Sequence, residues 1–185
     1  MKAEVTLTGA TDENADDNAT DLLPVSVREG SKGTIVQLGT DSKRTSSDTP
    51  FGLANKYAAA LNLYSAQELG SGSKNIVKAA WPYDASWQYE DANDLPVRVY
   101  MANTDRTNNL EGWIPENEMT LVYDGTISIP MKTKGEVAVE LTTPFAYQNG
   151  KNLAVLTVVH TDKNLQYTNF YAYKSPLDEN CSFHW

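Results

Sequence analysis

The fold is decided by residues 112–159, which read GWIPENEMTLVYDGTISIPMKTKGEVAVELTTPFAYQNGKNLAVLTVV. Apolar and polar residues alternate through much of this stretch. Such alternation is typical of strands with one buried face and one solvent-exposed face. The pairs Asp124-Gly125 and Asn149-Gly150 are expected to form tight turns. The final apolar run should be a central strand that is covered on both faces. We therefore expect four consecutive antiparallel strands, at residues 119–123, 126–130, 137–141 and 152–159.

Shorter strands are expected on the N-terminal side of this stretch, at residues 22–27, 34–38, 61–64, 75–81 and 97–102. Ser65 is followed three residues later by Glu68, a capping-box pattern that predicts one short helical turn. Only residues 53–61 show a weak apolar stripe at helical spacing. The pattern of about nine or ten short antiparallel strands predicts an all-β sandwich or barrel.

Composition and charge limit the classes of function. The chain has 185 residues and 41% hydrophobic content, enough for one domain with a real core. Its net charge of -9 argues against nucleic acid or an anionic membrane as the main partner. No apolar run approaches the roughly 20 residues of a membrane span. The single cysteine, Cys181, cannot form an internal disulfide, so the fold must be held by packing, and the compartment stays open.

The N-terminal residues 1–33 are expected to be an acidic linker segment, with a short edge strand at residues 5–7. Residues 11–21 (TDENADDNATD) are dense in Asp and Asn. These side chains are the ligands that calcium prefers, although the spacing of an EF-hand loop is missing. The sequence therefore predicts a solvated segment, with calcium binding as the alternative, followed by a domain at residues 34–185.

Few residues suggest catalysis. His160 and His184 are the only histidines, and neither belongs to a zinc-binding or nucleophile motif. His160 directly follows an apolar strand, where a strand-end hydrogen bond is the expected role. Cys181 has no CxxC or Cys-His spacing, so an inert thiol is expected. Two facing carboxylates, as a glycosidase needs, are not visible from sequence. We therefore predict a protein without a catalytic site.

Residues 81–94 (WPYDASWQYEDAND) carry two Trp, two Tyr and four carboxylates between two predicted strands. Exposed aromatic rings stack on the apolar faces of sugars, and nearby carboxylates accept hydroxyl protons. The same ring types anchor protein interfaces. Trp87, Tyr89 and Asp91 are the residues that we most expect to contact the ligand. Asp84 and Asp94 are expected to be polar neighbours or calcium ligands.

An alternative interpretation of this segment is structural. Trp81 and Tyr83 would continue the preceding strand into the core, and only Trp87 and Tyr89 would be exposed. Both interpretations remain open at this point, because sequence alone does not show where the strand ends.

Several short motifs, taken in order, resemble a known group of domains. They span much of residues 34–185 and resemble the jelly-roll modules of surface and secreted proteins of Bacteroidetes. These modules are similar to the cleaved-adhesin (haemagglutinin) domains of gingipain proteases, and the resemblance is strongest to uncharacterised members of the group. The motifs are residues 49–51 (TPF), 63–70 (LYSAQELG), 99–104 (VYMANT), 113–115 (WIP), 121–125 (LVYDG), 143–147 (TPFAY) and 152–155 (NLAV).

The resemblance implies a two-sheet jelly roll that binds glycans or host proteins through its loops, often with structural calcium and without catalysis. It also implies a secreted or cell-surface location. None of the family's calcium ligands can be placed on matching positions here. The chain is short and shows no leader sequence, which leaves three possibilities: an excised domain, a protein whose leader was trimmed, or a component of a phage or other particle. A structural component of such a particle is the alternative function, with a virion location. A jelly-roll glycan hydrolase is a further alternative.

Overall fold

The computed structural model of the protein describes residues 33–38, 44–46, 49–162, 165, 167–173, 175–177 and 181–184. The chain divides into two units, Met1–Ile35 and Val36–Trp185. The strands predicted at residues 5–7 and 22–27 lie outside the described residues, and so does the calcium-binding alternative at residues 11–21. The fold described below is that of the second unit.

The described part of the second unit is built almost entirely from strands. It contains nine of them, together with one short α-helix and one 3-10 turn. The elements are β1 (Arg44–Ser46), β2 (Tyr57–Tyr64), α1 (Ala66–Leu69), β3 (Lys74–Asp84), β4 (Ala92–Thr104), η2 (Glu116–Glu118), β5 (Thr120–Ile129), β6 (Lys134–Tyr147), β7 (Asn152–His160), β8 (Asn169–Ala172) and β9 (Ser182–His184).

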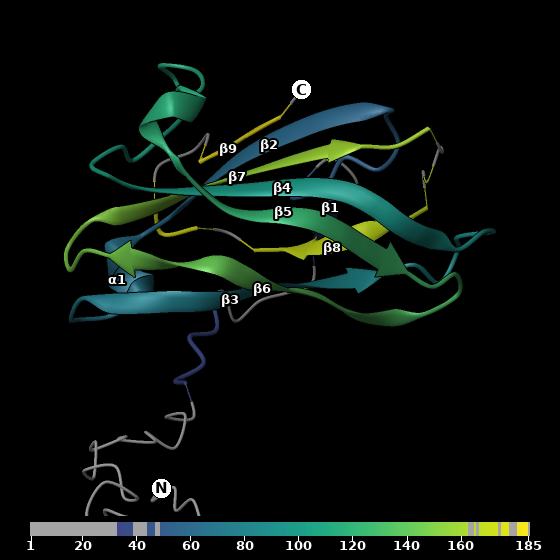
Figure 1. Ribbon diagram of the computed structural model, residues 1–185, viewed down its shortest axis with the longest axis horizontal. Helices are drawn as coiled ribbons and strands as arrows, with labels where there is room; N and C mark the ends of the chain where they lie inside the picture. Colours follow the sequence, from purple (N-terminus) through teal and green to yellow (C-terminus); the bar gives the residue numbers. More distant parts are fainter. Residues whose placement is uncertain are drawn as a thin grey trace, which may run out of the picture. The chain divides into compact units, whose positions relative to one another are not determined.

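The strands form two antiparallel sheets, with the orders β1-β8-β3-β6 and β5-β4-β7-β2-β9 (Figure 1). The pairs β1 with β8, β2 with β7, β3 with β6 and β4 with β5 are all hydrogen-bonded. These are the pairs of one long hairpin that has folded over into two sheets, which is the jelly-roll arrangement. Strand β9 extends the five-stranded sheet beside β2. The predicted all-β sandwich of jelly-roll type is confirmed.

Two clusters of buried side chains hold this unit together. The first lies between the sheets and takes side chains from both, such as Val139 of β6 and Val155 of β7. The second lies on the outer face of the five-stranded sheet, where Leu156 of β7 packs with Ile114 from the β4–β5 connection. Burying one such aliphatic side chain contributes about 1.5 to 3 kcal/mol. Strand β7 is central and supplies both clusters, as its continuous apolar run predicts.

The tight turn expected at Asp124-Gly125 is absent, because β5 runs straight through this pair. Gly125 lies opposite Val97 in the ladder with β4. A Cβ atom placed on Gly125 would approach the Tyr123 hydroxyl oxygen to 2.7 Å, so the glycine makes room for this ring. The four strands expected over residues 112–159 are therefore three, and β6 lies in the other sheet from β5 and β7.

Other local predictions have mixed outcomes. The capping box is confirmed: the Ser65 hydroxyl accepts from the Glu68 N–H, and the Glu68 carboxylate accepts from the Ser65 N–H, both at 3.2 Å. The turn at Asn149-Gly150 is also confirmed, with Gly150 at a φ of 82°. The strand predicted at residues 34–38 is wrong, since this stretch has no regular structure and is mostly exposed.

The weak helical stripe at residues 53–61 is overridden by tertiary pairing. Strand β2 begins at Tyr57 and pairs with β7 along its whole length, and with β9 over residues 60–62. Leu61 and Leu63 then lie on the outer face, in the second cluster. The apolar residues are therefore buried by sheet packing, which decides between the two periodicities.

Candidate functional site

The jelly-roll topology gathers four connections at one end of the described sandwich, which we call the loop end. Antiparallel strands that alternate in direction bring every second connection to the same end. In Figure 1 the loop end lies on the right, where β3, β5 and β7 finish. The connections between these elements span residues 47–56 (β1–β2), 85–91 (β3–β4), 130–133 (β5–β6) and 161–168 (β7–β8).

The β3–β4 loop is bonded to the β5–β6 loop by the main chain and one side chain. Ala85 donates its N–H to the Thr133 carbonyl at 2.8 Å, and its own carbonyl accepts from the Lys132 N–H at 2.9 Å. The Met131 N–H donates to Asp91 Oδ1 at 2.8 Å. These three hydrogen bonds fix the position of one loop relative to the other. They also satisfy backbone groups that would otherwise lack a partner.

A buried glutamine anchors the β3–β4 loop from inside. Gln88 is only 2% exposed. Its Oε1 accepts a hydrogen bond from the Thr168 hydroxyl, and its Nε2 donates to the Glu90 carbonyl at 2.5 Å. The Gln88 N–H donates to the Ala85 carbonyl at 3.0 Å, which closes a turn over residues 85–88 and leaves its neighbours Trp87 and Tyr89 exposed.

The outward side chains form a group that we call the aromatic platform, made of Trp87, Tyr89 and Tyr167. Trp87 is 73% exposed, Tyr89 is 74% exposed and Tyr167 is 49% exposed. The rings of Tyr89 and Tyr167 meet edge to face, with centroids 5.4 Å apart. Met131, on the adjoining β5–β6 loop, adds another exposed apolar side chain. The loop end thus presents large apolar groups from three connections.

The preceding aromatic residues belong to the core, as the structural interpretation has it. Strand β3 continues to Asp84, so the loop between strands is shorter than residues 81–94. Tyr83 is 6% exposed and packs in the first cluster. Trp81 is half-buried, and its ring meets Phe51 edge to face at 5.2 Å.

Asp84 forms a structural ion pair next to the β3–β4 loop. Its carboxylate forms an ion pair with Lys134 Nζ at 2.6 Å and accepts from the Ser86 N–H at 2.9 Å. The hydrogen bond from Lys134, followed by those from Ser86, lowers the pKa of Asp84 to about 2. Asp84 therefore stays ionised and joins the end of β3 to the start of β6.

Asp91 and Asp94 occupy different positions. Asp91 is exposed within the loop, and one of its oxygens accepts from Met131 as described above. Asp94 lies in β4 at an irregularity in the pairing with β5, has a φ of 50°, and its N–H donates to the Ser128 hydroxyl. Bulges of this kind re-aim side chains at the ends of strands. Of the predicted carboxylates, Asp91 is the one that shares a loop with Trp87 and Tyr89.

The sequence analysis missed Tyr167 and the role of Gln88. Tyr167 comes from a connection far along the chain, and only the pairing of β3 with β8 brings it beside Tyr89. Residues 86 and 87 form a turn, so the alternation of a strand does not predict that Gln88 is buried. No local signal identifies Thr168 as its partner.

Other chemical groups are dispersed over the fold. The His160 ring stacks on Tyr57, with centroids 4.4 Å apart and an 8° angle between the ring planes. His184 lies in β9, and Cys181 is a free thiol just before it. Among the described residues, no three or more His, Cys, Asp or Glu side chains form a group that could hold a metal ion.

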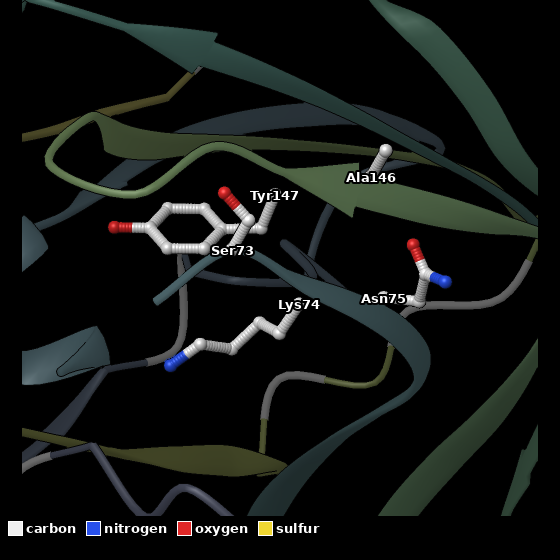
Figure 2. A pocket seen from close by; sticks show the side chains of 5 residues that line it. All are labelled: Ser73, Lys74, Asn75, Ala146 and Tyr147. Carbon is white, nitrogen blue, oxygen red and sulfur yellow. The ribbon is translucent and has the colours of Figure 1, made fainter. Parts of the chain in front are cut away.

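A hollow of about 330 Å³ lies at the opposite end, where β3 begins and β6 ends (Figure 2). It is lined by Ser73, Lys74, Asn75, Ala146 and Tyr147, and the side chain of Lys74 extends beside the Tyr147 ring. Lys74 Nζ donates to the Leu69 carbonyl, and the Tyr147 hydroxyl donates to the Lys151 carbonyl. These groups brace the end of the sandwich, and the exposed aromatic side chains lie elsewhere.

Comparisons of the chain with protein-family models, curated proteins and solved structures found no match. The adhesin resemblance therefore stays a prediction. Within the part of the chain that the structure describes, no helix has the length and apolar character needed to cross a bilayer. The function must be argued from the loop end itself.

Proposed function

We propose that the protein is a non-catalytic recognition module, acting on or outside the cell, that binds glycans or host proteins through the aromatic platform. One observation carries this proposal: Trp87 and Tyr89 are each more than 70% exposed on both sides of a buried, hydrogen-bonded Gln88. Large aromatic side chains that are held outward on a fixed loop lose little conformational entropy when a ligand covers them.

Sugars fit this arrangement chemically. The faces of the Trp87 and Tyr89 rings can cover the apolar C–H face of a pyranose. Glu90 and Asp91 on the same loop carry carboxylates, a group that accepts hydrogen bonds from hydroxyls. Since both groups are anionic, a neutral glycan is favoured over an acidic one.

A protein surface is the second type of ligand that suits the aromatic platform. Trp and Tyr are the side chains that most often dominate protein interfaces, and Met131 beside them is typical of such surfaces. The adhesin resemblance supports both ligand types. Calcium dependence, which that resemblance implies, stays part of the proposal.

The proposal is tested by screening the full chain on arrays of glycans and host extracellular proteins, with calcium and with a chelator. Trp87→Ala should abolish the strongest signals. The matched control is Leu110→Ala, because Leu110 is also 74% exposed but lies in the β4–β5 connection at the other end. Equal loss of signal in both variants, or no loss in Trp87→Ala, would reject the aromatic platform as the binding site.

The alternatives give different results in the same preparation. Regular oligomers in sedimentation or electron microscopy, without array binding, would favour a structural particle component. Release of products from polysaccharides would favour a jelly-roll hydrolase. A monomer that binds a glycan without cleaving it agrees with the recognition module.

A further inference from the structure

The outer face of the five-stranded sheet is covered over only part of its length. Towards the β4–β5 connection, Tyr100 and Leu156 are buried in the second cluster under Ile114. Towards the loop end, Arg98 of β4 points outward, because its neighbours Val97 and Val99 face the core between the sheets. This part of the sheet therefore presents side chains to the solvent.

A hollow of about 220 Å³ lies on this open part, which we call the outer hollow. Val158 is half-buried there and provides an apolar surface, and the exposed His160 stands two residues further along β7. The residues that line the outer hollow are Pro96, Val97, Arg98, Asp124, Val158 and His160.

The imidazole of His160 is stacked on one neighbouring ring. His160 and Tyr57 are directly opposite in the ladder between β7 and β2. Their rings are stacked, with centroids 4.4 Å apart and planes only 8° from parallel. Tyr57 supports one face of the imidazole, and His160 offers a polar wall to the outer hollow.

The facing wall is an ion pair. Arg98 Nε donates to Asp124 Oδ2 at 3.2 Å, and each side chain is 57% exposed. A guanidinium carries five N–H donors and a carboxylate two acceptor oxygens, so the pair can present donors and acceptors side by side. Its two charges cancel, which makes this wall suited to hydroxyl groups and gives an anion no net attraction.

We propose that the outer hollow is a binding site for one neutral pyranose unit. The C–H face of the sugar lies on Pro96 and Val158, and its hydroxyls bond to Arg98, Asp124 and His160. The volume is below the 300 Å³ or so at which pockets for drug-sized ligands begin, so it fits a single ring. The outer hollow shares no residue with the aromatic platform, so it is a second site.

The test uses methyl β-D-galactopyranoside, methyl β-D-glucopyranoside and methyl α-D-mannopyranoside as neutral probes, with methyl β-D-glucuronide as the acidic one. Each is titrated into the full chain while two-dimensional NMR follows backbone amides and the Arg98 Nε–H. At least one neutral probe should give saturable shifts at Arg98 and His160. Arg98→Gln and His160→Ala should each weaken that binding by about tenfold or more.

Lys78→Gln is the matched control, because Lys78 forms an exposed ion pair with Glu140 on the other sheet. It should leave the titration unchanged, and so should Trp87→Ala, which separates this site from the aromatic platform. Asp124→Asn serves as a second variant if Arg98→Gln does not fold. Shifts confined to the aromatic platform, no saturable shift with any neutral probe, or tighter binding of the glucuronide would overturn the proposal.

Discussion

The Thr168 hydroxyl donates a hydrogen bond to Oε1 of Gln88, and both residues are at most 2% exposed. This one bond joins the β3–β4 loop, which carries Trp87 and Tyr89, to the β7–β8 connection, which carries Tyr167. The aromatic platform therefore depends on a polar contact that lies beneath it.

Replacing Gln88 should weaken ligand binding although no aromatic side chain of the platform is changed. Gln88→Leu leaves the buried Thr168 hydroxyl without this acceptor, so we expect stability to fall by about 1 to 3 kcal/mol. Ligand binding should fall as well, because the loop is no longer held. Urea unfolding and array binding check the two effects.

The double variant Gln88→Leu with Thr168→Val is the control for this prediction. Removing both partners together leaves no Thr168 hydroxyl without its acceptor, and only the Glu90 carbonyl loses a donor, so the double variant should cost less than the sum of the single changes. Strict additivity of the two single changes would show that the hydrogen bond is not what holds the loop.

Trp87→Ala should change the free energy of unfolding by no more than about 0.5 kcal/mol, because the side chain is 73% exposed. Phe51→Ala is the contrasting core variant. Phe51 is fully buried and contacts the rings of Trp81 and Phe170, so its loss should cost about 3 to 5 kcal/mol. Thermal and urea unfolding compare the two, and a large loss for Trp87→Ala would assign that ring to the core.

The Asp84–Lys134 ion pair should make the free energy of unfolding depend on pH in the acidic range. The pKa of Asp84 falls from 3.8 in the unfolded chain to about 2 in the folded protein. Its contribution is therefore present above about pH 4 and is lost as the pH falls through about 2. Because the Lys134 side chain is 61% exposed, solvent screening limits the contribution to about 1 kcal/mol.

Asp84→Asn measures this contribution directly. The variant should be less stable than the parent protein at neutral pH, and the two unfolding curves should converge as the pH approaches 2. A difference that persists at the lowest pH would mean that the carboxylate charge is not the cause.

Gly125→Ala should be destabilising for a steric reason. The added methyl would lie 2.7 Å from the Tyr123 hydroxyl oxygen, so the ring must move, at a cost of about 1 to 3 kcal/mol. Combining it with Tyr123→Ala should recover part of that loss.

Gly150→Ala is the contrasting variant. Gly150 has a φ of 82° and nothing lies within 4 Å of its added Cβ, so the strain in this variant is purely conformational. Urea unfolding of the set distinguishes the two causes.

Much of the fold was predictable because its signals are local. The alternation of Val137, Val139 and Leu141 fixes which face of β6 is buried, and all three are in the first cluster. The capping box of Ser65 and Glu68 is complete within four residues. The turn predicted at Asp124-Gly125 failed because the propensity of this pair for turns is outweighed by pairing with β4, while Gly125 accommodates the ring of Tyr123.

The sequence by itself determined the all-β class, the buried faces of the strands and the two most exposed rings, Trp87 and Tyr89. The first two follow from a period of two residues, and the two rings were singled out by the aromatic composition of residues 81–94, so all of these signals are local. Only the tertiary structure decided that Gln88 is an anchor, that Tyr167 joins Tyr89, and that Arg98 and His160 share a hollow. Each of these relationships joins residues on different strands or loops, and such neighbours exist only once the long hairpin has folded into two sheets.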